Sequence, residues 1–288
     1  MADTEFLKDN LSGSVPTEIS TNLIKNLVEE SIAFNVCRHE SMLSDKKVLP
    51  MLTDEGTAHW VGEGEKIGTS APTFEYPTLY AKKLAVIIPF TKEKLNDSAI
   101  SVIDELQAAI KDAFMKAIDM AVFFGTNSPF DTNIITEASK SNIVNGSGKI
   151  DLDISEAMSK VEANDLSVSA IIAHNGMKHE MRTLRDSSGN ALVVPGGASG
   201  SQIYNTNIFY PANKSWDKTQ ADILLGDFNR AVIGTREGIE YEILKEATVG
   251  EINLAEQDLV AIKCTMRFGF VVVDSKAFAV VKPKQKSK

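Results

Sequence analysis

One uninterrupted helical pattern in the middle of the chain constrains the fold more than any other feature. The segment NDSAISVIDELQAAIKDAFMKAIDMAVFFG begins with Asn96, Asp97 or Ser98 as a candidate N-cap and ends with Gly125 just past the last apolar residue. Apolar residues recur at helical spacing along it: Val102, Ile103, Leu106, Ala109, Ile110, Ala113, Phe114, Ala117, Ile118, Ala121 and Val122. About 27 residues at about 1.5 Å each would span about 40 Å. The pattern predicts a spine helix over residues 98–124, apolar on more than one side, against which other elements pack.

The segment before this helix reads as two strands around a glycine-rich, charged tip. It runs from His59 to Thr91 as HWVGEGEKIGTSAPTFEYPTLYAKKLAVIIPFT. Much of it offers no apolar face that a core of its own could use, so it predicts a long hairpin that extends away from the rest of the chain. Pro89 lies in the returning strand and predicts that this strand runs along the edge of a sheet or leaves the sheet there, because proline cannot donate to a neighbouring strand.

The remaining elements alternate between helix and strand. Residues 1–15 are polar and predict an arm, and Pro16 begins a predicted helix. From Asp151 onward the chain predicts a helix, the buried strand SVSAIIAH and a second helix, followed by a long loop from Asp186 to Lys218 with little periodicity. Further strands close the chain. Together these elements predict an α+β fold.

Charge and composition exclude several classes of protein. The chain of 288 residues carries 39 acidic and 30 basic residues, a net charge of −9, which argues against a general nucleic-acid binder because phosphate contacts need clustered Lys and Arg. No run of eighteen apolar residues predicts a membrane span, and the polar N-terminus is unlike a signal peptide. Cys37 and Cys264, far apart in the sequence, are interpreted as reduced and buried, with a disulfide as the alternative.

Glycine-rich and nucleophile motifs fail on inspection. Gly62, Gly64 and Gly68 in GEGEKIG have the wrong spacing for a phosphate-binding loop, and the neighbouring glutamates would repel phosphate. In NGSGKI the position that requires Ser or Thr holds Ile150. Ser199 lacks the flanking glycine arrangement of a nucleophile elbow and follows no strong strand. No nucleotide or acyl-transfer site is predicted.

Metal and acid–base motifs fail as well. His174 and His179 are five residues apart and do not share a helix face, so they are interpreted as surface or helix-cap histidines. Paired acids such as Glu29–Glu30 and Asp104–Glu105 lie on predicted helix surfaces, where solvated charge is the default. We therefore expect no enzyme activity, no cofactor and no metal.

The order of the parts resembles the major capsid proteins of tailed bacteriophages of the Hong Kong 97 type (HK97-like). The resemblance runs from about Val15 to Val281. It is carried by the hairpin AHWVGEGEKIGTSAPTFEYPTLYAKKL, by LNDS entering the spine helix, by AVFFGTNSP at its end, by LLGDFNRAVIGTREGIEYEI, and by QDLVAIKCTMRFGFVVVDSKAFAVV. Each motif is loose by itself, but their order and spacing are specific.

The resemblance implies a division of the chain into the parts of that family. These are an N-terminal arm and helix at 1–33, the start of a peripheral P-domain at 34–55, an extended hairpin or E-loop at 56–82, the P-domain with its spine helix at 83–150, an axial A-domain at 151–248, and a P-domain return strand with the C-terminal tail at 249–288. Two departures from the family matter. The chain reaches its arm within about fifteen residues of Met1, which implies a separate scaffolding protein or none. Lys66 lies near the hairpin tip, but no partner for a covalent cross-link to a neighbour can be matched.

The resemblance also implies which residues touch other subunits. Contacts from the hairpin are expected at Trp60, Glu63, Glu65, Lys66, Phe74, Tyr76 and Tyr80. Contacts at the centre of a capsomer are expected at Asp186, Asn190, Tyr204, Asn207 and Trp216. Hinges are expected at Gly56, Gly62, Gly64 and Gly125, because glycine absorbs backbone change most easily.

The function implied is that of a shell subunit. The implied protein self-assembles into hexamers and pentamers of an icosahedral shell that packages double-stranded DNA through weak, non-specific contact. Portal and decoration proteins are further expected partners, the virion is the expected location, and the host bacterial cytoplasm is the expected place of assembly. Two alternatives remain open: an encapsulin-like shell that encloses cargo enzymes, and an α/β enzyme built around Ser169–Asp186.

Overall fold

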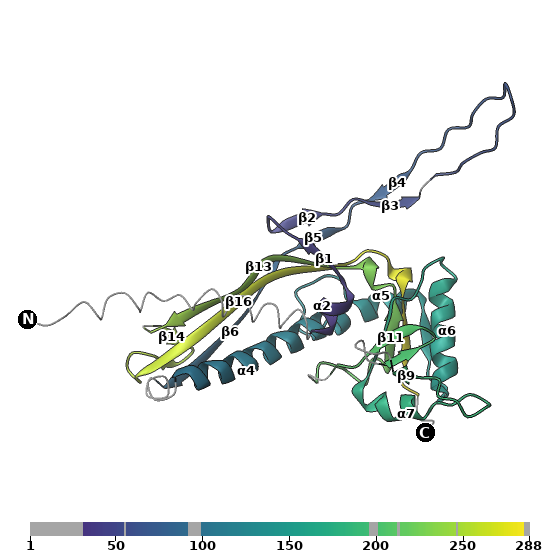
Figure 1. Cartoon of the computed structure of the whole chain (residues 1–288). Helices are drawn as coiled ribbons and strands as arrows, with labels where there is room; N and C mark the ends of the chain where they lie inside the picture. Colours follow the sequence, from purple (N-terminus) through teal and green to yellow (C-terminus); the bar gives the residue numbers. More distant parts are fainter. Residues whose placement is uncertain are drawn as a thin grey trace, which may run out of the picture.

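The computed structural model describes residues 31–54, 56–91, 99–195, 201–211, 214–245 and 247–284. The predicted arm and the helix from Pro16 lie outside the described residues, as do the candidate N-caps Asn96–Ser98 and the serine at 199. What the structure describes is an elongated part with a long helix, a more compact part beside it, and a hairpin that rises from their junction (Figure 1).

The long helix expected in the middle of the chain is α4, which spans Ala99–Asp119 and continues as a π-helical turn over Met120–Phe124. Gly125 follows with φ of 69°, the left-handed conformation that ends a helix at low cost for glycine. Ile110, Phe114 and Ile118 are buried. Ala109 and Ala113 are exposed, although the apolar pattern placed them on the packed face.

A four-stranded sheet lies along this helix and forms the elongated part of the subunit (Figure 1). Its order is β1 (Arg38–Ser41), β13 (Ala231–Leu244), β16 (Leu259–Val272) and β6 (Lys82–Thr91). Pro89 pairs with Ala261 of β16 and lies in β6, the edge strand of the described sheet, as the sequence predicted. The long β13 and β16 pair over most of their length, with two register shifts between Thr235 and Glu240.

The compact part is built on a seven-stranded mixed sheet. Its order is β7 (Ile143–Asn145), β17 (Phe278–Lys282), β12 (Ile223–Gly226), β8 (Ala170–Ala173), β11 (Thr206–Phe209), β10 (Ser201–Ile203) and β9 (Val194–Pro195). The three last-named strands lie in the segment that the sequence analysis expected to be a long loop, so that expectation was wrong for these residues. Strands of two to four residues are too short to show an alternating pattern.

Short helices surround this sheet and the end of the spine helix. They are α2 (Ile32–Val36), α5 (Ile134–Ser141), α6 (Ile150–Glu162) and α7 (Lys178–Thr183). The largest buried apolar cluster joins α4, α5 and faces of both sheets, and a second cluster lies between α6 and the seven-stranded sheet. A small pair, β14 (Thr248–Val249) and β15 (Ile252–Asn253), completes the described strands.

Both cysteines are buried and free, as the sequence predicted. Burial raises the pKa of the Cys264 thiol to about 12 and raises that of Cys37 further, with the Asp119 carboxylate adding to the second shift. Because the thiolate is the reactive form, both thiols are chemically quiet at neutral pH.

A buried carboxylate ties the first described helix to the spine helix. Asp119 accepts a hydrogen bond from the Ser31 hydroxyl at 2.9 Å and one from the Ala33 backbone N–H at 3.1 Å. Ser31 and Asp119 are both fully buried. Since a buried carboxylate is costly unless it is hydrogen-bonded, this contact fixes where α2 lies on the last turn of α4.

Candidate functional site

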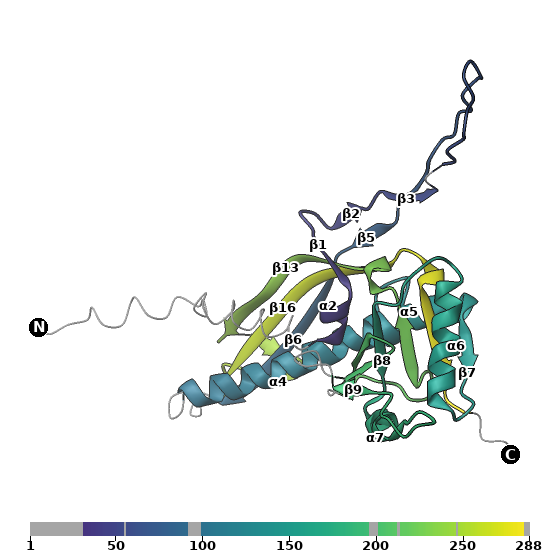
Figure 2. The same ribbon diagram turned by 45° about the vertical axis from the view of Figure 1, so that its right-hand side comes forward.

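The hairpin is the part of the molecule whose outer half lacks a core. Its base is a short pair, β2 (Lys46–Val48) with β5 (Thr78–Tyr80), and its middle is a second pair, β3 (Met51–Asp54) with β4 (Thr73–Glu75). Residues 57–76 are all exposed, and residues 56–72 form no strand. Both views show the ribbon leading away from the two sheets (Figures 1 and 2). A segment that buries nothing in its own subunit is a candidate surface for contact with another one.

The base of the hairpin is seated on two glycines of the four-stranded sheet. Gly234 and Gly269 face each other across β13 and β16. A Cβ on Gly234 would lie 2.6 Å from Met42 Sδ and 3.0 Å from Leu79 Cδ1, and a Cβ on Gly269 would lie 2.9 Å from the backbone oxygen of Tyr80. Leu79 is fully buried there. At Gly269 the obstacle is backbone, so a larger residue there would push the hairpin off the sheet, whereas at Gly234 the nearest atoms belong to side chains that can move.

Ion pairs on the protein surface and backbone hydrogen bonds also hold the base of the hairpin. The Asp45 carboxylate contacts the guanidinium of Arg236 and lies 3.7 Å from that of Arg267. The backbone oxygen of Asp45 accepts from the N–H of Ala81 at 2.8 Å, and Met42 N donates to Thr235 O at 2.9 Å. The first turn of the ribbon is therefore fixed to the sheet at several points.

Sequence reasoning missed this seat, although a signal was present. Glycine interrupts the apolar strands in AVIGTRE and MRFGFVV, and a glycine inside a strand often marks the close approach of another backbone. What approaches cannot be known from a single strand.

Replacing Gly269 with valine is expected to loosen the hairpin base while leaving the subunit folded. The added side chain meets backbone atoms of Tyr80, which cannot rotate away, so Leu79 loses its burial. A cost of about 1–3 kcal/mol in unfolding free energy is expected from overpacking. Hydrogen exchange at the amides of residues 78–81 should accelerate. Unchanged exchange there would show that the glycine seat does not hold the hairpin, and Thr265→Val, at a partly exposed position of the same strand, is the control.

Two prolines interrupt the ribbon at the level between its two strand pairs. Pro50 follows β2, and Pro77 precedes β5 on the opposite strand. Leu49 N donates to Pro77 O at 2.9 Å, but the reciprocal bond cannot form because proline has no N–H. The ladder is weakest at this level, between the seated base and the exposed outer half.

The residues predicted to make contacts from the hairpin are all accessible. Trp60 is fully exposed, at 105%, while Phe74, Tyr76 and Tyr80 expose 48%, 63% and 47%. Glu63 and Lys66 are exposed at the tip, and Glu65 accepts from Gly62 N at 3.1 Å. Large aromatic side chains in water are costly, so these positions favour a partner surface.

Among the predicted hinges, Gly56 and Gly64 adopt positive φ of 80° and 83°, whereas Gly62 does not. Gly125 also has positive φ, but a Cβ there would lie 2.5 Å from Asn133 Nδ2, so its role in the structure is a tight helix end. The hinge assignments themselves remain predictions.

The residues predicted for the centre of a capsomer fall into two groups. Asp186 and Asn190 form an exposed turn in which the Asp186 carboxylate accepts from Asn190 Nδ2 at 2.9 Å, which lowers the pKa of Asp186. Tyr204 is about half exposed, and Asn207 accepts from Gln202 at 2.7 Å.

Trp216 lies beside the end of the spine helix. It packs edge-on against Phe124, with ring centres 5.1 Å apart, and donates to Ala221 O at 2.7 Å.

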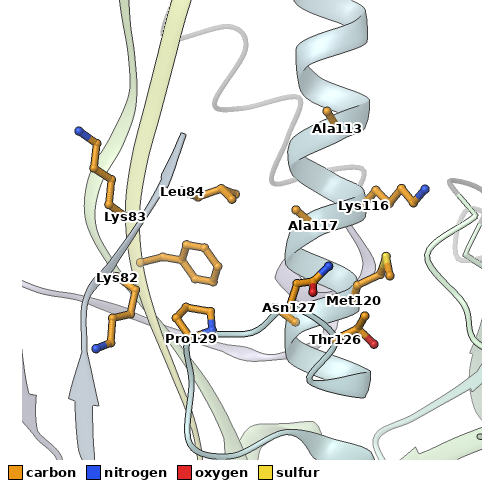
Figure 3. A pocket seen from close by; sticks show the side chains of 12 residues that line it. Lys82, Lys83, Leu84, Ala113, Lys116, Ala117, Met120, Thr126, Asn127 and Pro129 are labelled. Carbon is orange, nitrogen blue, oxygen red and sulfur yellow. The ribbon is translucent and has the colours of Figure 1, made fainter. Parts of the chain in front are cut away.

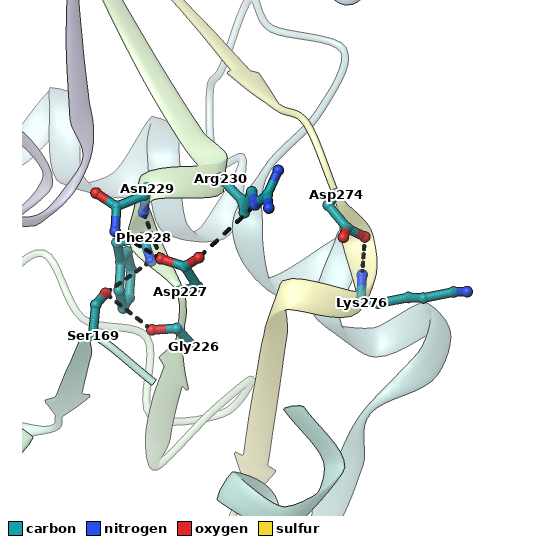
Figure 4. A network of polar contacts seen from close by, with 8 residues as sticks. All are labelled: Ser169, Gly226, Asp227, Phe228, Asn229, Arg230, Asp274 and Lys276. Atoms are coloured by element: carbon teal, nitrogen blue, oxygen red, sulfur yellow. Dashed lines mark hydrogen bonds and ion pairs between the residues drawn. The ribbon is translucent and has the colours of Figure 1, made fainter. Parts of the chain in front are cut away.

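The corner around Ser169 is a structural network (Figure 4). The Ser169 hydroxyl donates to Gly226 O at 3.2 Å and accepts from Phe228 N at 3.0 Å, so it is fully used in closing a turn. Asp227 and Asp274 each cap a short helix. In this arrangement the Ser169 hydroxyl joins the start of β8 to the end of β12, and it is not activated as a nucleophile.

Of the two histidines singled out in the sequence, His174 caps a short helix and His179 is exposed on α7. His174 Nδ1 accepts from Gly176 N at 3.1 Å as a helix cap, and burial with nearby Lys218 lowers its pKa. Within the described residues no three acidic, His or Cys side chains are grouped to hold a metal ion. Among the described helices, none has the length and apolar character needed to span a bilayer.

Comparisons with known proteins agree on one family. The model of the phage capsid family matches residues 12–282. A major capsid protein of Staphylococcus phage 80alpha is 28% identical over 297 residues, which cover 99% of this chain and 89% of the relative. A solved chain from Microbacterium phage Oxtober96 superimposes with a TM-score of 0.77 at 28% identity, covering 88% of this chain and 91% of that one. A chain from Mycobacterium phage Cain gives 0.75 at 25% identity, with 90% and 92% covered.

Proposed function

The chain belongs to the phage capsid family and has the HK97-like fold of a tailed-phage major capsid protein, and we propose that its hairpin clamps neighbouring subunits in the shell. The observation that carries this proposal is the hairpin itself. It exposes Trp60, Phe74 and Tyr76 while its base is fixed by the glycine seat and by Asp45.

The energetics favour such a role. Burying aromatic surface contributes about 25 cal/mol per Å², so a few of these rings on a neighbour supply several kcal/mol per contact. A closed shell repeats that contact many times. Because the base is held while the outer half is free of the body, the hairpin can present the same side chains at slightly different angles.

The remaining parts fit the proposed assembly of hexamers and pentamers into an icosahedral shell around double-stranded DNA. The turn at Asp186 and Asn190 and the exposed Tyr204 would meet around the capsomer axis. Trp216, partly buried against Phe124, would support that region. Scaffolding, portal and decoration proteins are the partners to seek, the virion is its place, and catalysis has no part in this role.

The direct test is to purify the protein, size it by light scattering and image the particles. We expect closed shells built of six- and five-fold capsomers. Small shells filled with a co-purifying enzyme would instead support the encapsulin-like alternative. A protein that stays monomeric under all assembly conditions would contradict the proposal.

Changing Trp60 to alanine is expected to weaken assembly and leave the subunit fold unchanged. Its side chain contacts water in the subunit, so the free energy of unfolding should change by less than about 0.5 kcal/mol. Loss of a buried interface tryptophan typically costs about 2 kcal/mol or more per contact. The measurements are shell yield by sedimentation and thermal unfolding of the unassembled subunit. Equal loss in both would place Trp60 in the subunit's own core.

A further inference from the structure

The chain contains the dipeptide Asn-Gly twice, at Asn145–Gly146 and at Asn175–Gly176. An asparagine before glycine is prone to lose its side-chain amide, because glycine has no side chain to hinder attack by its own backbone nitrogen on the asparagine Cγ. Both asparagines are exposed. The two sites differ in the group that the glycine N–H contacts, and this difference governs their chemistry.

The first Asn-Gly site is held in the seven-stranded sheet. Asn145 is the last residue of β7 and pairs with Lys282 of β17. Gly146 N donates to the backbone oxygen of Lys282 at 3.0 Å, and a Cβ on Gly146 would lie 2.8 Å from that same oxygen. A carbonyl oxygen is too weak a base to remove an amide proton, and the strand pairing fixes the backbone. We therefore expect Asn145 to be stable.

The second Asn-Gly site lies on an exposed turn and contacts a base. Asn175 begins a 3₁₀ turn, η3 (Asn175–Met177), that leads into α7. Gly176 N donates to Nδ1 of His174 at 3.1 Å. Burial, with the charge of Lys218 as the smaller cause, lowers the pKa of His174, so its imidazole is neutral at neutral pH. Nδ1 therefore keeps the lone pair that can take the proton of Gly176 N.

The turn itself gives this site little protection. A longer helix would fix the backbone of Asn175, but η3 has three residues, and the N–H groups at the start of a helix have no backbone partner within it. The Asn175 side-chain amide has no hydrogen-bond partner among the residues that the structure describes. A Cβ on Gly176 would lie 2.5 Å from His174 Cε1, so the contact with the imidazole requires glycine after Asn175.

We propose that Asn175 is a self-modification site at which the His174 imidazole promotes loss of the side-chain amide. Nδ1 takes the proton of Gly176 N, this nitrogen attacks Cγ of Asn175, and the bond between Cγ and Nδ2 breaks. Nδ2 leaves as ammonia with the proton returned by the imidazole, and a cyclic imide remains. Water then opens the ring at either carbonyl, which gives aspartate or isoaspartate.

The surroundings of Asn175 suit the product as well. The new carboxylate lies at a pocket of about 310 Å³ whose lining includes Lys214 and Lys218, and these two positive charges stabilise it. Each modified copy gains one negative charge in a chain whose net charge is already −9, so the modified fraction rises with the age of the protein. This inference uses no residue of the hairpin and is independent of the proposed clamp.

Tandem mass spectrometry of the full chain, sampled during incubation at neutral pH, tests the proposal. Conversion at Asn175 is expected to be at least about tenfold faster than at Asn145. The key variant is His174→Asn, because an amide oxygen can accept from Gly176 N in place of Nδ1 but cannot take its proton. Conversion at Asn175 should then slow at least about tenfold. His179→Asn, at an exposed histidine of α7, is the matched control and should leave the rate unchanged.

The site at Asn145 reports on folding in every sample. A variant that unfolds would expose both dipeptides equally, so a change in the ratio of the two rates is specific to the turn at Asn175. Equal rates at the two sites of the unaltered chain would overturn the proposal, and this comparison needs no variant. A His174→Asn chain that keeps Asn145 intact and converts Asn175 at the original rate would also overturn it, since the imidazole would then take no part.

Discussion

Deleting Glu63–Thr69 is expected to abolish closed shells while the subunit still folds. Every residue removed is exposed, and none belongs to a strand. The deletion also removes the two carboxylates of the tip. If the hairpin clamps neighbours, each contact loses several kcal/mol, and a shell that repeats this contact cannot close. The measurement is the fraction of protein in shells, by sedimentation and electron microscopy.

The matched control keeps the length of the hairpin and removes the charged and apolar side chains of its tip. A chain in which Glu63–Thr69 is replaced by seven Gly and Ser residues retains the reach of the ribbon. If side-chain contacts matter, its assembly defect should be nearly as large as that of the deletion. If only the length of the hairpin matters, it should assemble. Thermal unfolding of the unassembled subunits should agree within about 0.5 kcal/mol for all three chains. Normal shells from the deleted chain would show that the hairpin does not clamp.

Changing Gly226 to alanine is expected to prevent stable folding. Gly226 ends β12 in the interior of the seven-stranded sheet and pairs with Phe278 of β17. A Cβ there would collide with the backbone oxygen of Ala277 and lie 2.9 Å from Phe278 Cα. Both obstacles are backbone atoms, so the strands must separate. Overpacking of this kind costs about 3 kcal/mol or more, a large part of the 5–15 kcal/mol that holds a domain folded.

Gly189→Ala separates this collision from the general cost of replacing glycine. Gly189 has φ of 85° and open space around it, so alanine there costs about 1 kcal/mol of backbone strain and nothing in packing. We expect soluble, cooperative unfolding for Gly189→Ala and insoluble or non-cooperative protein for Gly226→Ala. A Gly226→Ala subunit with an unchanged unfolding midpoint would mean that β12 and β17 can move apart freely.

The sequence predicted the elements that carry their own signal. The apolar repeat that contains Ile110, Phe114 and Ile118 is long enough to define α4, and Gly125 marks its end. Pro89 identified an edge strand, and the two isolated cysteines are buried and free. These signals are local, because each depends on residues within a few turns or one strand.

The parts that sequence could not predict depend on partners far away in the chain. β10 and β11 are strands because they extend an existing sheet from β8, which no pattern in Ser201–Phe209 reveals. Ala113 shares the apolar periodicity of Phe114 but is exposed (Figure 3), since burial depends on which elements pack against each face of α4. The packing of Trp216 against Phe124 also joins residues far apart in the chain, and no local pattern reveals it.

The prolines of the hairpin have a consequence for the subunit before it assembles. A two-stranded ribbon has two bare edges, and such edges invite uncontrolled stacking of strands from other copies into aggregates. Pro77 removes one hydrogen bond from the ladder between the two strands. Along a strand, successive backbone N–H groups point alternately toward the partner strand and away from it, and Pro50 follows Leu49, whose N–H points toward the partner. Pro50 therefore stands where the N–H would point outward. Its missing donor leaves a gap in the edge on that side. An unassembled subunit can therefore expose the long apolar hairpin at high concentration without aggregating through its strand edges. The hairpin stays available for a neighbouring subunit in the correct orientation.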